Sequence, residues 1–191
     1  DNLHKFGVPV VVAINHFYAD TDAEIEFVEK FCKEKGADFA VTKCFTEGGA
    51  GSEELAKKVM SACDKENDFR FLYDIDTPIY EKIDTIAREI YGADGVEYTK
   101  EAKKSIDEFI KLGCDNMPVC MAKTQYSLSD NPALLGRPHG FKITVSSASL
   151  SNGAGFLVCQ TGSVMTMPGL SKSPAAYKID IDENGNTVGL F

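Results

Sequence analysis

The sequence predicts an α/β fold that joins part of a parallel-sheet domain to a smaller α/β domain. Three observations support this class. A β-branched, apolar run over residues 8–14 is typical of a buried parallel strand. A helix pattern and a second strand pattern follow it, which completes a βαβ unit of about the usual length. From Asn67 onward the pattern changes, which indicates a second unit.

The first unit, residues 1–66, contains a strand, a helix, a second strand and a second helix. These elements are expected over residues 8–14, 22–35, 39–45 and 52–63. Pro9 fits only at the beginning of the first strand, where a missing N–H does no harm. Thr21 and Glu24 have the spacing of a capping box, which predicts the start of the first helix, and Gly36 predicts its end.

Residues 67–170 are expected to form the smaller α/β domain. Its predicted elements are helices over residues 78–91 and 99–112 and strands over residues 117–122, 141–145 and 155–159. Residues 171–191 are expected to form a C-terminal hairpin that packs back on the first unit. The Asn184-Gly185 pair predicts its turn.

The first unit is too small to bury both faces of its sheet. A parallel sheet is normally covered on both faces, and two strands with two helices do not supply that cover. We therefore expect neighbouring strands upstream of Asp1. The chain is interpreted as the C-terminal part of a larger protein.

Charge and hydropathy disfavour two classes of partner. Lys and Arg number 20 against 29 Asp and Glu, so the net charge is −9 at pH 7, and no basic cluster is present. Such a surface repels phosphate backbones and anionic membranes. No apolar run reaches the ~18 residues that a membrane-spanning helix needs. We expect neither nucleic acid nor a membrane as a partner.

The cysteines and histidines give no metal-site pattern. Six Cys and three His are spread along the chain without the close spacing of zinc ligands, so no metal site is expected. The even number of cysteines leaves disulfides as an alternative. Buried, reduced thiols in a cytoplasmic protein are the favoured interpretation.

Large aromatic residues follow both strands of the first unit. Phe17 comes just after the first strand, in the segment that includes Asn15 and Tyr18, and Phe45 closes the second strand. Ligands collect beyond the carboxyl ends of parallel strands, and two rings about 7–8 Å apart can sandwich a flat heteroaromatic ligand. The alternative is that Phe17 and Phe45 cap the end of the core.

A glycine-rich turn after the second strand is a second candidate contact. The N–H groups of Gly48 and Gly49 can face an anion at the start of a helix, although a flexible turn is an equal alternative. The loop over residues 166–170 is expected to border the same cleft through Pro168 and Gly169. The phosphate-binding pattern G-x-x-x-x-G-K-[ST] is absent from the sequence.

Blocks along the whole chain resemble formate–tetrahydrofolate ligases. They are residues 11–17 (VVAINHF), 20–24 (DTDAE), 46–51 (TEGGAG), 91–93 (YGA), 118–129 (PVCMAKTQYSLS), 153–157 (GAGFL), 166–170 (TMPGL), 180–182 (DID) and 189–191 (GLF). The blocks occur in the family's order and match roughly the last third of its usual length. The resemblance therefore implies a fragment of a nucleoside-triphosphatase-like α/β domain.

The resemblance also implies an activity and a site. The family uses ATP, with Mg²⁺, to activate formate as formyl phosphate, and then transfers the formyl group to N10 of tetrahydrofolate. The family's pterin ring lies between two aromatic residues at the positions of Phe17 and Phe45, with Val41 at an apolar wall position. Phe45 stands where the family usually has Trp, and Tyr18 where many members have Pro. On this basis ring stacking is favoured over capping of the core.

In the family the ATP-binding residues lie upstream, so this chain is expected to bind the pterin and to be inactive without that part. No residue here is a candidate general acid or base. The resemblance further implies a homo-oligomer, usually a homotetramer, that responds to monovalent cations. Two alternatives stay open: a folate-binding module without catalysis, and an interaction fragment whose aromatic pair belongs to the core.

Overall fold

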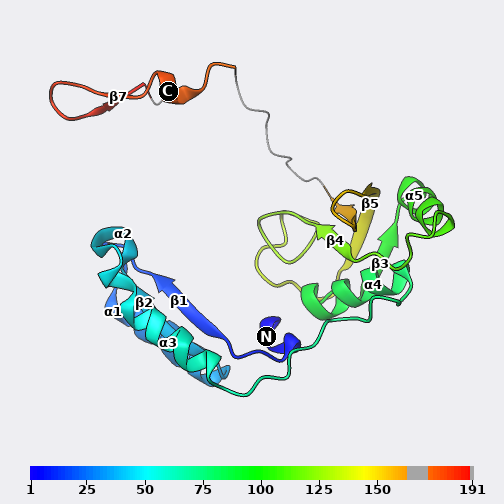
Figure 1. Cartoon of the computed structure of the whole chain (residues 1–191), viewed down its shortest axis with the longest axis horizontal. Coiled ribbons are helices and arrows are strands. Elements are labelled where there is room, and N and C mark those ends of the chain that lie inside the picture. Colours follow the sequence, from blue (N-terminus) through cyan, green and yellow to red (C-terminus); the bar gives the residue numbers. More distant parts are fainter. Residues whose placement is uncertain (163–171, 190–191) are drawn as a thin grey trace.

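A computed structural model describes residues 1–162 and 172–189 of the 191-residue chain. Its strands form a two-stranded parallel sheet, a four-stranded mixed sheet and a two-stranded hairpin (Figure 1). Helices pack against the parallel sheet and against the mixed sheet, so the predicted α/β class is confirmed.

The first unit has the predicted βαβ order. It consists of β1 (Val11–Asn15), α1 (Asp22–Glu34), β2 (Asp38–Thr42) and α3 (Glu53–Cys63). Strands β1 and β2 are parallel, with Val11 opposite Asp38. Val12 of β1 shares a cavity with Phe31 of α1, whereas its neighbour Val11 shares one with Val59 of α3. Because successive strand residues point to opposite faces, the two helices lie on opposite faces of this sheet.

The second strand is shorter than predicted. It ends at Thr42, and the chain then forms the single helical turn α2 (Cys44–Glu47) and the 3-10 turn η2 (Ala50–Ser52). The N–H of Lys43 donates to the carbonyl oxygen of Gly51 at 2.9 Å, and the hydroxyls of Thr42 and Ser52 are hydrogen-bonded at 2.9 Å. These bonds turn the chain back on itself. Phe45 therefore belongs to a helical turn, so the prediction that it closes the second strand is wrong.

The second unit is built on a sheet with the strand order β3-β5-β6-β4. Its elements are α4 (Ile79–Thr85), the π-helix η3 (Ile86–Tyr91), β3 (Gly95–Tyr98), α5 (Lys100–Lys111), β4 (Val119–Ala122), β5 (Lys142–Ser151) and β6 (Phe156–Thr161). Strand β3 is parallel to β5, β4 is parallel to β6, and β5 and β6 are antiparallel. Strand β3 and the extension of β5 beyond Val145 were not predicted.

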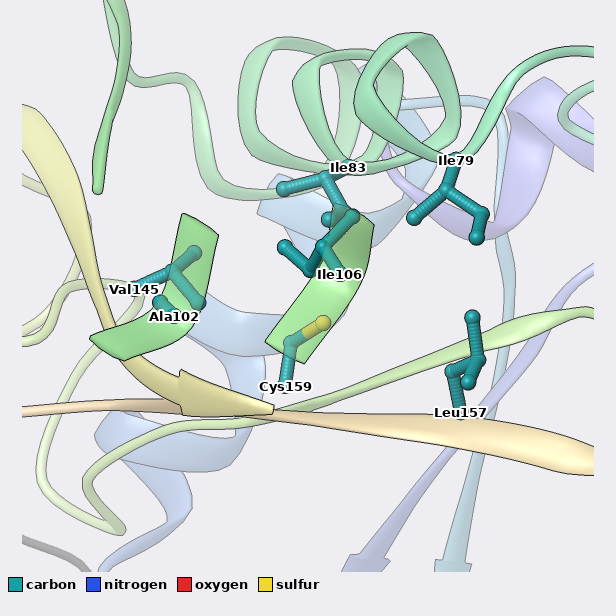
Figure 2. Packing of buried hydrophobic residues seen from close by; sticks show 7 residues of the cluster. All are labelled: Ile79, Ile83, Ala102, Ile106, Val145, Leu157 and Cys159. Carbon is teal, nitrogen blue, oxygen red and sulfur yellow. The ribbon is translucent and has the colours of Figure 1, made fainter. Parts of the chain in front are cut away.

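The main core of the second unit lies between its two α-helices and its central strands (Figure 2). Its buried members are Ile79 and Ile83 of α4, Ala102 and Ile106 of α5, Val145 of β5, and Leu157 and Cys159 of β6. All seven are almost completely shielded from solvent. Burial of this apolar surface is the main force that stabilises this part of the fold.

A buried lysine lies beside this core. Lys82 of α4 is fully shielded, and its Nζ donates hydrogen bonds to the carbonyl oxygens of Asp115, at 2.7 Å, and Met117, at 3.1 Å. Burial lowers the pKa of this amine below its ordinary value. Asp115 also accepts a bond from the backbone N–H of Ile79 at 3.0 Å. Together these bonds fix the segment that enters β4 against α4.

The first residues of the chain connect the two units. Asn2, beside the 3-10 helix η1 (Leu3–Phe6), donates to the carbonyl oxygen of Ile90 at 2.7 Å. The amine of Lys5 forms an ion pair with Glu89 at 2.6 Å. Gly7 then accepts a bond from the N–H of Asp68 at 2.9 Å. The start of the chain therefore contacts both the second unit and the linker that follows α3.

The tail forms the predicted hairpin. It contains the 3-10 turn η4 (Ala175–Tyr177) and the strands β7 (Asp180–Ile181) and β8 (Thr187–Val188), which are antiparallel. Asp182 holds the turn, because its carboxylate accepts the backbone N–H groups of Asn184 and Asn186. The packing of this hairpin on the first unit stays a prediction, as do the domain limits at residues 66 and 170.

Candidate functional site

Phe17 and Phe45 lie side by side. Their ring centroids are 6.3 Å apart, and the ring planes are tilted by 38°. Both side chains are open to solvent, with exposed fractions of 50% for Phe17 and 78% for Phe45. Neither residue belongs to a buried hydrophobic cluster of the described chain. In the described structure the two rings are therefore open to solvent and are not part of a buried core.

The turn after β1 positions Phe17. The N–H of His16 extends the ladder to β2 by donating to the carbonyl oxygen of Thr42 at 2.9 Å. Asp20 then closes the turn, because its carboxylate accepts the N–H of Phe17 at 2.8 Å and its own N–H donates to the carbonyl oxygen of Phe17. The exposed ring is therefore carried on a turn whose backbone is fixed.

Helix α1 begins at once after this turn, with the predicted capping box. The N–H of Thr21 donates to the carboxylate of Glu24 at 2.9 Å, and the N–H of Glu24 donates to the hydroxyl of Thr21 at 3.3 Å. Bonds from Thr21 hold the pKa of Glu24 below its ordinary value. Because Thr21 follows Asp20 directly, the cap also anchors the turn that carries Phe17.

Phe45 is carried by α2 instead of by the end of a strand. The N–H groups of Thr46 and Glu47 both donate to the carbonyl oxygen of Lys43, and the N–H of Gly48 donates to that of Cys44. These bonds form one compact turn that directs Phe45 toward Phe17. The two rings thus come from consecutive strand-to-helix connections of one sheet.

In this structure the two rings contact each other, without the space that a ligand between them would need. A planar ligand between parallel rings needs two aromatic contact distances, about 7 Å in all. The observed 6.3 Å separation and 38° tilt place the rings in contact with each other. Opening by about 1 Å and rotation toward parallel planes would admit such a ligand. Exposed side chains change rotamer on the ps–ns timescale, so this adjustment is available to both rings.

The other predicted contact residues have different surroundings. Val41 is half-buried on β2 and lines a cavity of about 430 Å³. Asn15 is exposed at the end of β1, and Tyr18 is fully exposed in the following turn. Gly48 and Gly49 are exposed, and the N–H of Gly48 already bonds within α2. Pro168 and Gly169 lie outside the described residues.

Charged side chains around the Val41 cavity were missed by the sequence analysis. Its lining includes His16, Asp22, Lys43, Glu47 and Glu54. Among the residues that the structure describes, no ion pair joins any of these groups. The sequence held one usable signal. Lys43 and Glu47 are four residues apart, a spacing that puts two side chains on the same face when the segment between them is helical.

Other classes of site have no counterpart in the described part of the chain. Residues 1–162 and 172–189 hold no group of three or more His, Cys, Asp or Glu side chains placed to bind a metal ion. Over the same ranges, no helix has both the length and the apolar character required to cross a bilayer. All six cysteines are free thiols; contrary to the expectation of burial, Cys44, Cys63 and Cys120 are exposed.

A larger, mostly apolar cavity of about 690 Å³ is built from other segments. It lies where η1 and the linker meet η3, and Phe6, Tyr73 and Ile90 are among its lining residues. None of the predicted site residues lines this cavity. Its apolar lining offers few groups that could orient a polar substrate.

Comparison with known protein families gives a match over the full length. The model of the formate–tetrahydrofolate ligase family matches residues 1–191. The matched region includes both aromatic residues and the whole of the Val41 cavity.

Proposed function

Because the chain belongs to the formate–tetrahydrofolate ligase family, we propose that it binds the pterin ring of tetrahydrofolate between Phe17 and Phe45. Family membership implies ATP and tetrahydrofolate as substrates. The proposed binding step would place N10 of the folate to receive the formyl group from formyl phosphate.

The observation that carries this proposal is the exposed ring pair at the carboxyl ends of two parallel strands. Exposed phenylalanines cost free energy in water, and a contact between two of them at a strand-end ligand position supports a planar guest. Val41 is half-buried near the carboxyl end of β2 and offers an apolar side chain at this end of the sheet.

Positioning is the role we propose for these residues. Holding the pterin makes the transfer of the formyl group effectively intramolecular, which can lower the barrier by several kcal/mol. No side chain of the pair can exchange a proton. We assign no general acid or base within the described residues.

The nucleotide is proposed to be held by another part of the enzyme. The described residues contain no cluster that fits a Mg²⁺ ion, and no lysine follows the Gly48–Gly49 turn in a phosphate-loop pattern. We therefore derive no step through ATP or Mg²⁺ from this chain. The cytoplasmic location, homotetrameric assembly and monovalent-cation response implied by the resemblance are kept as proposals.

The free edge of β1 is where we propose that this other part docks. Asp38 donates to the carbonyl oxygen of Val10 and His16 donates to that of Thr42, so even-numbered residues direct their backbone groups toward β2. The peptide groups of Val11 and Ala13 then face the opposite edge, which has no partner strand among the described residues.

Titration with tetrahydrofolate tests the proposed pterin site. We expect Phe17→Ala and Phe45→Ala each to weaken binding on the order of 10-fold or more, because each removes one stacking surface. Phe27→Ala is the matched control, since Phe27 is 72% exposed but lies on α1 outside the site. Calorimetry of all four proteins gives the affinities, and thermal unfolding checks that each variant is folded.

Equal affinities in wild type and both site variants would contradict the proposal. Loss of binding in Phe27→Ala as well would indicate an unspecific apolar effect. Turnover of formate, ATP and tetrahydrofolate by the chain alone would contradict the assignment of the nucleotide site elsewhere. Binding without turnover, restored by the complementary part of the enzyme, would support it.

A further inference from the structure

The turn that carries Phe17 contains no buried side chain. All four of its residues, Phe17, Tyr18, Ala19 and Asp20, are exposed to solvent. Burial of apolar side chains, which fixes most of a folded chain, therefore does not fix this turn. Its conformation has to come from hydrogen bonds and from the elements on either side of it.

Asp20 makes two hydrogen bonds to the backbone of Phe17. Its carboxylate oxygen Oδ2 accepts the N–H of Phe17 at 2.8 Å, and its own N–H donates to the carbonyl oxygen of Phe17 at 3.0 Å. The second bond is the one that closes an ordinary β-turn and is available to most residues. The first is charge-assisted and depends on the Asp20 side chain. One residue thus holds Phe17 at both its N–H and its C=O.

The two ends of the turn are anchored independently of Asp20. Before it, the N–H of His16 donates to the carbonyl oxygen of Thr42 in β2, and after it Thr21 belongs to the capping box of α1. Between these anchors, the carboxylate of Asp20 makes the one side-chain hydrogen bond of the described turn. The backbone conformation at Phe17 therefore depends on this carboxylate more than on any other side chain.

The partner ring is held in a different way. The turn α2, which carries Phe45, is closed by backbone N–H groups that donate to the carbonyl oxygens of Lys43 and Cys44, and no side chain caps its first residue. Substitution of a side chain leaves such backbone bonds in place. A change at Asp20 can therefore release Phe17 while Phe45 stays where it is.

We propose that Asp20 is a positioning residue of the pterin site, an inference that rests on the proposed function. Its bonds to Phe17 set the direction in which the Cα–Cβ bond of Phe17 leaves the chain, and so the place of the ring opposite Phe45. In this role Asp20 acts through Phe17 and does not itself contact the ligand. Without the carboxylate the turn samples other conformations, and the apparent affinity falls with the fraction that still has the ring in place.

Titration with tetrahydrofolate tests this role. We expect Asp20→Ala to bind about 10-fold more weakly than wild type, and Asp20→Asn within about 3-fold, because the amide oxygen of Asn can still accept the N–H of Phe17. Asp182→Ala is the matched control, since Asp182 holds another exposed turn through the N–H groups of Asn184 and Asn186, and it should leave the affinity unchanged. Asp20→Asn as weak as Asp20→Ala would overturn the inference, because the charge itself would then meet the ligand.

A double-mutant cycle shows whether Asp20 acts through the ring of Phe17. In a Phe17→Ala background, Asp20→Ala should weaken binding no further, since there is no ring left to position. In a Phe27→Ala background, where the ring of Phe17 is present, the full loss of about 10-fold should return. Equal losses in the two backgrounds would overturn the inference and would indicate a general structural effect.

A measurement without ligand separates this inference from the proposed function. The chain has no Trp, so Phe45→Trp places its sole indole opposite Phe17. In that background Asp20→Ala should raise quenching of the indole by acrylamide toward the value for Phe17→Ala, whereas Asp182→Ala should not. Unchanged quenching in Asp20→Ala would overturn the inference even if tetrahydrofolate binds. Raised quenching in a protein whose wild type binds no tetrahydrofolate would support the hold of Asp20 on the ring and contradict the proposed function.

Discussion

At the residue scale, Phe45 is one of two positions, with Tyr18, where this chain departs from the pattern that the family resemblance implies. The resemblance places Trp there, and an indole has a larger face for stacking than a phenyl ring. Phe45 is exposed and packs in no buried cluster of the described residues, so a larger ring does not disturb the core. If the proposed function holds, a substitution here should change the affinity for the pterin with little effect on stability.

We expect Phe45→Trp to bind tetrahydrofolate more tightly than wild type does. The added stacking area is worth about 0.5–1 kcal/mol, roughly a 2- to 5-fold decrease in Kd. Calorimetric titration measures the change. Phe45→Leu, which keeps an apolar side chain without an aromatic face, should bind more weakly than wild type. The order Trp, Phe, Leu is expected, and a Leu variant as good as wild type would remove stacking as the explanation.

At the element scale, features set by near neighbours in the sequence were predictable. The capping box of α1 depends only on Thr21, Glu24 and the N–H groups between them, and the structure confirms it. Features that depend on residues far away in the sequence were not predictable. Strand β3 exists because Gly95–Tyr98 pairs with β5, whose first residue is Lys142. Its short sequence after a Gly-Ala-Asp turn carries no such information.

The same difference between near and distant partners in the sequence explains which residues of the candidate site could be predicted. The two phenylalanines could be selected as candidates because each stands at or just after the end of an apolar run, although the second run continues beyond the end of β2 at Thr42. Lys43 and Glu47 could not, because their common face depends on the turn at Thr42. That turn is fixed by the hydroxyl of Ser52 and the carbonyl of Gly51, which a strand-like pattern through Phe45 does not reveal.

The α1 cap gives a prediction with a defined pH dependence. Thr21→Ala removes the hydroxyl that accepts the Glu24 N–H and should cost about 1 kcal/mol near neutral pH. Hydrogen bonds from the N–H and hydroxyl of Thr21 hold the pKa of the Glu24 carboxyl below its ordinary value in the folded state. Its stabilising effect is therefore present above the ordinary pKa of a glutamate and is lost as the pH falls through the lower, folded-state pKa.

Urea denaturation of both proteins between pH 7 and pH 3 measures this effect. The gap in unfolding free energy between wild type and Thr21→Ala should narrow at the acid end. The backbone N–H of residue 21 still bonds Glu24 in the variant, so a gap that stays constant over the whole range would show that the bond from the Thr21 hydroxyl to the Glu24 carboxylate contributes nothing.

At the scale of the whole molecule, the two units are connected by a small set of polar contacts. The ion pair of Lys5 with Glu89 and the bond of Asn2 to Ile90 tie η1 to η3. Beside them, the backbone of Gly7 lies against that of Asp68 in the linker. Lys5 and Glu89 are both partly exposed, so their ion pair contributes little. The close approach of the two backbone segments is the more specific feature of this junction.

Gly7→Ala should therefore destabilise the protein more than Gly36→Ala does. Both glycines have positive φ, 71° and 72°, so alanine costs roughly 1–2 kcal/mol at either position through backbone strain alone. At Gly36 the added methyl group meets nothing within 4 Å, whereas at Gly7 it would overlap the carbonyl oxygen of Asp68. This overlap should add about 1–3 kcal/mol.

Urea denaturation gives the loss of stability for both variants. Faster chymotrypsin cleavage at the exposed Phe69 and Phe71 in Gly7→Ala would show that the linker is the part that is disturbed. Equal losses in the two variants would mean that the contact between Gly7 and Asp68 does not hold the junction together.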